Sequence, residues 1–104
     1  MLSKFLIKWQ LNPLMTPADP EERSKLWLSM LEMVKAELNS GESIDWGEYC
    51  DASGGYSISE GTDADLFTGV LRWMPYIIFD VKPVLTVDQV MESVKKAAVG
   101  EKTK

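Results

Sequence analysis

Apolar residues recur at every second position in two stretches of the chain. The first stretch alternates with Lys8 and Gln10 and holds Phe5, Ile7, Trp9 and Leu11. The second alternates with Ile78, Asp80 and Lys82 and holds Ile77, Phe79 and Val81. Successive side chains of a strand point to opposite faces, so both stretches are predicted to be strands with one apolar face. Asn12-Pro13 ends the first strand, and Pro83 is expected to end the second.

Three other stretches have the spacing of amphipathic helices. The first begins at Asp19-Pro20, where Asp19 can cap the free amides and Pro20 suits the first helical position. Its apolar stripe is Trp27, Leu31, Val34 and Leu38. A second helix begins after Thr62 and is ended or kinked by Pro75, and a third follows the capping box Thr86–Gln89.

Two short β-like runs lie between the first two helices, at Ile44–Cys50 and Tyr56–Glu60. The loop Asp51–Gly55 separates them, which predicts a hairpin with a five-residue connection. Gly54 and Gly55 are expected to adopt positive φ in this turn.

The elements therefore follow the order β, α, β, β, α, β, α. This order predicts an α+β fold, a ferredoxin-like βαββαβ sandwich in which two helices cover one face of a four-stranded antiparallel sheet. An open α+β sheet of another topology is the alternative. The 104 residues fit one domain, placed at residues 1–99, and residues 100–104 are expected to form a short disordered tail.

The sheet face away from the two helices has a mixed composition. On the first strand it carries Lys4, Leu6, Lys8 and Gln10, and on the last it carries Tyr76, Ile78, Asp80 and Lys82. Exposed apolar patches of this kind mark a partner surface. Either the C-terminal helix folds across this face, or two copies pack sheet against sheet as a homodimer; the second arrangement is favoured.

Composition excludes several classes of function. The chain has no histidine, so Ser-His-Asp and Cys-His catalysis within one chain are ruled out, and neither a metal site nor a cofactor is expected. The formal net charge of −5 disfavours nucleic acid as a partner. The single cysteine excludes an internal disulfide. Lys4 and Lys8 interrupt the N-terminal apolar run too often for a signal peptide, and the longest apolar run is too short to span a bilayer, so a cytoplasmic protein with no membrane partner is expected.

Three strings carry a resemblance to a known group: the run from Trp46 to Tyr56, Trp73-Met74-Pro75-Tyr76, and Pro83-Val84-Leu85. Over Lys4 to Ala98 the chain resembles a family of small uncharacterised bacterial and archaeal proteins similar to the dimeric α/β-barrel superfamily. That superfamily includes cofactor-free monooxygenases, muconolactone isomerase-like enzymes, YCII-like proteins and haem enzymes. Several of these use a histidine, which this chain lacks, so the resemblance implies no catalytic residue here and argues against haem.

Two groups of residues are candidates for a binding site. Trp46, Tyr49 and Tyr56 lie near the hairpin and would line a pocket for a flat or apolar ligand; the alternative is that they anchor the core. Lys8, Glu48 and Asp80 are charges on predicted strands that would converge in a dimer cavity; the alternative, which is favoured, is a solvated or ion-paired face. Glu48 shares a phase with Trp46, but the pattern does not fix which face that is.

Two other features are assigned a structural role. Cys50 has no histidine to activate it and is expected to be buried or inert. The run Ser53–Ser57 is not followed by a helix, so it indicates a turn and not a phosphate site. Among the remaining candidates, Trp9 and Trp73 are expected to be core residues.

The sequence thus leaves the biochemical function unknown and three hypotheses open. The favoured one is a small-molecule-binding module, with a cavity formed at a sheet-to-sheet dimer and a small apolar or aromatic ligand. The first alternative is a cofactor-independent isomerase or monooxygenase-like enzyme, which rests on analogy of fold alone. The second is a protein-interaction or structural module.

Overall fold

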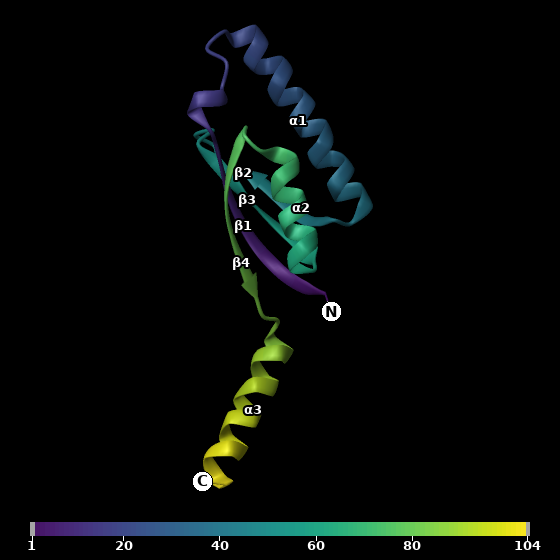
Figure 1. The fold of residues 1–104 in the computed structure, drawn as a ribbon, viewed down its shortest axis with the longest axis vertical. Helices are drawn as coiled ribbons and strands as arrows, with labels where there is room; N and C mark the ends of the chain where they lie inside the picture. The colour runs from purple at the N-terminus through teal and green to yellow at the C-terminus, as the bar shows by residue number, and fades with distance from the viewer. Residues whose placement is uncertain (1, 104) are drawn as a thin grey trace.

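Four antiparallel strands form one sheet, and two helices lie on the same side of it (Figure 1). The computed structural model describes residues 2–103. Its elements are β1 (Ser3–Leu11), a 3-10 turn η1 (Pro13–Met15), α1 (Pro20–Ser40), β2 (Ser43–Glu48), β3 (Gly54–Gly61), α2 (Asp63–Trp73), β4 (Ile77–Val84) and α3 (Val87–Thr103). The strand order is β2-β3-β1-β4. The predicted α+β class, with a four-stranded antiparallel sheet and three helices, is confirmed.

The helix starts follow the predicted caps. The Asp19 carboxylate accepts a hydrogen bond from the Glu22 amide at 3.0 Å, at the start of α1. Thr62 and Asp65 form a reciprocal capping box at α2. At α3, the Thr86 amide donates to Gln89 Oε1 at 2.8 Å and the Gln89 amide donates to Thr86 Oγ1 at 3.2 Å. These side chains satisfy amides that have no partner within the helix.

The register assigns every strand residue to a face. Trp9 pairs with Gly55 on β3 and with Phe79 on β4, so these three positions share the face below the helices. The buried apolar residues lie where this face meets the helix layer: Phe5, Ile7, Trp9, Val34 and Ile77. The prediction that Trp9 packs under the helices is confirmed.

The glycines of the hairpin serve a different purpose from the one predicted. Gly54 and Gly55 lie within β3, and among residues 2–103 positive φ occurs at Gly41 and Ala52 instead. A Cβ at Gly55 would overlap the Gly47 carbonyl and come within 2.6 Å of the Trp9 indole. The expectation of positive φ is therefore wrong: Gly55 is required because the Gly47 carbonyl and the Trp9 ring both lie against its backbone.

Two prolines mark the flanks of β4. α2 ends at Trp73, shortly before Pro75, as the sequence predicted. The Met74–Pro75 peptide bond is cis. β4 continues one residue past Pro83, so the predicted end of the strand is wrong. β4 is an edge strand with β1 on its one paired side, and such a position tolerates the missing amide hydrogen of proline.

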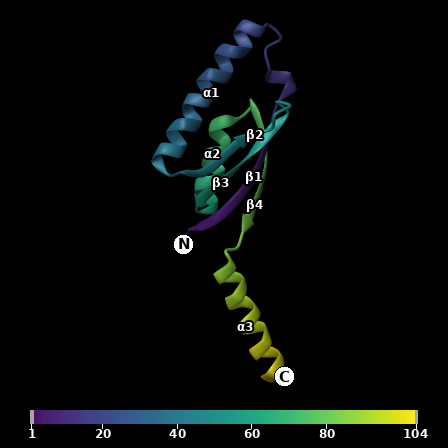
Figure 2. The same cartoon turned by 180° about the vertical axis from the view of Figure 1, so that it is seen from behind.

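Helix α3 leaves the end of β4 and extends away from the sheet (Figures 1 and 2). The chain consequently measures 65 × 25 × 23 Å with a radius of gyration of 17.9 Å. A compact domain of this length has a radius of gyration of about 13 Å. In this chain α3 does not fold across the open sheet face, so the open sheet face and the apolar side of α3 are both left uncovered.

No helix among residues 2–103 is long and apolar enough to cross a membrane. Lys104, in the predicted tail, lies outside the described residues.

Candidate functional site

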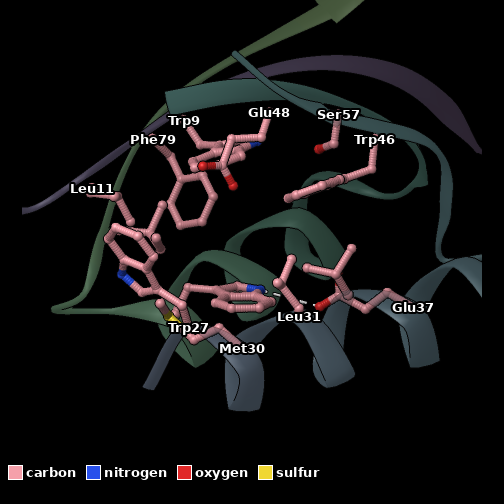
Figure 3. Close-up of a pocket in the computed structure, with 13 residues that line it drawn as sticks. Trp9, Leu11, Trp27, Met30, Leu31, Glu37, Trp46, Glu48, Ser57 and Phe79 are labelled. Atoms are coloured by element: carbon pink, nitrogen blue, oxygen red, sulfur yellow. Dashed lines mark hydrogen bonds between the residues drawn. The ribbon is translucent and has the colours of Figure 1, made fainter. Parts of the chain in front are cut away.

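A cavity of about 240 Å³ lies between α1 and the covered face of the sheet (Figure 3). All four tryptophans of the chain line it, two from strands and two from helices. The lining residues are Trp9, Leu11, Trp27, Met30, Leu31, Val34, Glu37, Trp46, Glu48, Ser57, Trp73, Ile77 and Phe79. We call this space the tryptophan cavity.

The sheet side of the tryptophan cavity is built on a pair of stacked indoles. The rings of Trp9 on β1 and Trp46 on β2 have centroids 5.4 Å apart and planes inclined by 15°. The Trp9 indole nitrogen donates to the Tyr56 carbonyl at 3.3 Å, which fixes its ring. Trp9 is buried and Trp46 is half-buried, so the Trp46 ring remains accessible from the cavity. Such a rigid aromatic surface suits the face of a flat ligand.

The helical side of the tryptophan cavity adds two further indoles and an aliphatic wall. The Arg23 guanidinium lies over the Trp27 ring of α1, with 5.6 Å between the Arg23 Cζ atom and the ring centroid. Trp73 on α2 donates its indole N–H to Glu37 Oε1 at 3.2 Å. Leu31 and Val34 complete this wall from successive turns of α1.

Glu37 is a carboxylate within an otherwise apolar helix face. Its Oε1 atom also accepts from Arg72 Nη1 at 3.3 Å, and the same Arg72 nitrogen lies 3.2 Å from Glu42 Oε2. Burial raises the pKa of Glu37 above its ordinary value; the Trp73 hydrogen bond and the Arg72 charge oppose this increase, and Glu42 adds to it. Glu37 thus retains its proton to a higher pH than an exposed glutamate would.

The raised pKa of Glu37 predicts a pH-dependent stability. Because the folded state binds the Glu37 proton more tightly than the unfolded state, this group favours folding below its ordinary pKa. That contribution is lost as the pH rises through the folded-state pKa. Glu37→Gln cannot titrate, so wild type should lose stability relative to this variant as the pH rises above the ordinary glutamate pKa. Urea denaturation of both proteins at several pH values measures this, and a wild type that gains stability relative to Glu37→Gln as the pH rises would contradict the assignment.

A second cavity of about 300 Å³ lies beside α2 and shares four lining residues with the first. The shared residues are Glu37, Ser57, Trp73 and Phe79. Its other lining residues include hydroxyl-bearing side chains and the charged residues Arg72, Glu60 and Asp65. The helix layer therefore covers the sheet with an apolar space under α1 and a polar space under α2, separated by Glu37 and Trp73.

The structure divides five of the six predicted site residues between the two faces of the sheet. Trp46 and Glu48 both line the tryptophan cavity, and Figure 3 shows the Glu48 carboxylate directed into it. Lys8 and Asp80 pair across β1 and β4 on the open face. Tyr56 is on that face too, and its hydroxyl donates to Asp45 Oδ2 at 2.8 Å.

Tyr49, the sixth candidate, lies in the turn after β2 and is exposed. Cys50 in the same turn is exposed as well, so of the expectation that it is buried or inert the first part is wrong and the second stays a prediction. The Ser53 amide and hydroxyl both donate to Asp51 Oδ1, at 3.0 Å and 2.7 Å, so Ser53 belongs to the turn. The remaining residues of the predicted Ser53–Ser57 turn lie in β3, so for them the prediction is wrong. No cluster of three or more potential metal-ligating side chains occurs in the described part of the chain.

Sequence reasoning missed Trp27 and Glu37 as site residues. A readable signal existed for Glu37, because it follows Val34 by three positions and so continues the apolar stripe of α1. A carboxylate on such a stripe is either paired or functional. Trp27 begins the same stripe, and only the packed structure shows that it lines a cavity.

The fold and cavity define a small α+β domain with an aromatic pocket inside one chain. The chain belongs to the family described as domain of unknown function DUF3303, whose model matches residues 3–98. No curated protein matches the chain. The biochemical function of the family is unknown, so any activity must be argued from the tryptophan cavity itself.

Proposed function

We propose that this domain binds a small, flat and largely apolar organic molecule in the tryptophan cavity. The observation that supports this most strongly is that all four tryptophans line one space. Ligand sites combine apolar and aromatic walls with a few polar groups that orient the ligand. Here Glu37, Glu48 and Ser57 are those polar groups.

The size of the cavity limits the ligand. At about 240 Å³ it is smaller than the roughly 300–1,000 Å³ of sites for drug-sized molecules. A body of one or two fused rings fits this limit. The stacked Trp9–Trp46 pair would contact the face of such a ring system, and Leu31 would contact its other side.

The proposal relocates the site predicted from sequence. The sequence placed the cavity at a sheet-to-sheet dimer, whereas the tryptophan cavity lies on the helix-covered side of the sheet within one chain. Ligand binding therefore does not depend on a second copy.

Filling the cavity should weaken binding. Leu31→Trp places a larger side chain in the tryptophan cavity, so we expect it to weaken binding of 1-naphthylmethanol at least about tenfold in calorimetry. The matched control is Leu28→Trp, because Leu28 is 65% exposed on α1 and does not line the cavity. The proposal would be contradicted if both variants weakened binding equally, or if neither variant weakened it.

A second candidate function is proton transfer within a bound ligand. The observation that favours it is the raised pKa of Glu37, a half-buried carboxyl beside the cavity. A carboxyl with a pKa nearer to neutrality serves better as a general acid or base. Turnover of a bound carbonyl compound that disappears in Glu37→Gln, while binding persists, would favour this enzyme over the binding module.

We further propose that the domain is a ferredoxin-like sandwich that pairs into a dimeric α/β barrel through its open sheet face. Support comes from the β-α-β-β-α-β order of the first six elements and from the uncovered surfaces. The open face mixes Lys8 and Asp80 with Ile58 and Ile78, and α3 exposes Val87, Val90, Met91 and Val94. A second copy of the chain would cover both surfaces.

A charge on the open face should prevent this pairing. We expect wild type to sediment as a dimer and Ile78→Glu to sediment as a monomer, since Ile78 lies at 44% exposure on that face. Phe67→Glu is the control, because Phe67 is exposed on α2, in the helix layer. A monomeric wild type would rule out the dimer but would leave the tryptophan cavity unaffected.

A further inference from the structure

The charged groups that line the tryptophan cavity are both acidic. Glu37 approaches from α1 and Glu48 from the end of β2, while no lysine or arginine belongs to the lining. Figure 3 shows both carboxyl groups at the border of the same space. A cavity with this charge distribution disfavours an anionic ligand and favours a cation.

The aromatic walls favour the same charge. Five rings line the cavity, the four tryptophans and Phe79. The face of an aromatic ring carries a negative quadrupole, and tryptophan attracts cations most strongly of the aromatic side chains. The molecule already uses this interaction once, where Arg23 lies over Trp27 at 5.6 Å.

The two carboxylates differ in how they are neutralised within the chain. Glu37 receives the Arg72 guanidinium and the Trp73 indole, so much of its charge is already compensated. Glu48 has no hydrogen bond or ion pair to another side chain within residues 2–103 and is exposed to solvent on one side. Glu48 is therefore the group able to pair with a charge that enters with the ligand.

We propose that the ligand of the tryptophan cavity is an organic cation, an amine or protonated nitrogen heterocycle attached to a flat apolar body. The inference rests on the proposed binding function and adds the charge of the ligand to it. The ring system would lie against the Trp9–Trp46 pair, and the cationic nitrogen would lie near Glu48. Binding should weaken as ionic strength rises, because Glu48 is accessible to solvent.

Two probes of the same shape test this. 1-Naphthylmethylamine is a cation at neutral pH, and 1-naphthylmethanol has the same ring system without the charge. Calorimetry at pH 7 and low salt should show the amine binding at least about tenfold more tightly than the alcohol. Glu48→Gln should reduce that ratio. Glu32→Gln removes an exposed charge of α1 outside the cavity lining and should retain it.

The possible outcomes separate this inference from the binding function. Equal affinities, or a preference for the alcohol, would overturn the cation inference and leave the binding function supported. An unchanged ratio in Glu48→Gln, or an equal loss in Glu32→Gln, would also overturn it. If neither probe binds, both proposals fail.

Discussion

Trp46→Ala is expected to weaken binding of 1-naphthylmethanol about 10- to 100-fold while the domain stays folded. Trp46 supplies the accessible half of the stacked pair, so its removal leaves a ligand without one aromatic partner. The residue is only half-buried and lies on the edge strand β2, which limits the effect on folding. Titration calorimetry gives the affinity, and circular dichroism reports the fold.

Two variants make this result specific. Tyr49→Ala removes an exposed aromatic residue just beyond the same strand but outside the cavity lining, and should leave the affinity within about twofold. Trp46→Phe keeps a smaller ring at the stack and should bind with intermediate affinity. If Tyr49→Ala weakens binding as much as Trp46→Ala does, the ligand binds at the hairpin surface and not in the cavity.

Trp9→Ala is expected to lower the free energy of unfolding by about 3–5 kcal/mol. At 8% exposure Trp9 is the buried partner of the stack, it lies on a central strand, and its indole nitrogen is bonded to the Tyr56 carbonyl. Truncation would remove the largest side chain of the buried core, enlarge the existing cavity and leave the Gly55 backbone without its cover. Urea denaturation monitored by circular dichroism measures the loss.

The comparison for Trp9→Ala is an apolar truncation outside the core. Leu14 is 90% exposed in η1, so Leu14→Ala should change stability by no more than about 0.5 kcal/mol. A loss below about 1 kcal/mol for Trp9→Ala would show that the sheet does not depend on the indole, contrary to the packing described above.

The fold was predictable wherever a local pattern specifies an element together with its buried face or its first residue. The alternation of Phe5, Ile7 and Trp9 identifies β1 and its buried face because both depend only on period-two spacing. The helix starts were predictable because a cap such as Thr62 acts on amides three residues away.

The candidate site was only partly predictable, because the face of β2 depends on its pairing. The register of β2 shifts between Ser43 and Asp45, and a shift by one residue exchanges the two faces of a strand. Sequence phase alone therefore could not place Trp46 and Glu48. The observed register places both under the helices, and it leaves Lys8, Asp80 and Tyr56 on the opposite side of the sheet.

The cavity itself arises from the spacing of the layers, which no local pattern encodes. The apolar stripe of α1 predicted that Leu31 and Val34 face the sheet, and Val34 is buried there. Trp27 and Trp73 belong to different helices, and only the packed structure shows that they share a space with Trp9 and Trp46. The C-terminal helix likewise had a readable pattern, but its direction away from the sheet did not follow from it.

The central claim, that one cavity lined by all four tryptophans binds a ligand, has a direct spectroscopic test. Each indole N–H gives one resonance in a ¹⁵N–¹H correlation spectrum, so the four tryptophans report on the cavity separately. Titration with 1-naphthylmethanol should shift all four resonances with a single saturable dissociation constant, while the backbone amides of Leu6 and Ile78 on the open sheet face stay in place. Unshifted indole resonances, or shifts confined to the open face or α3, would contradict the account.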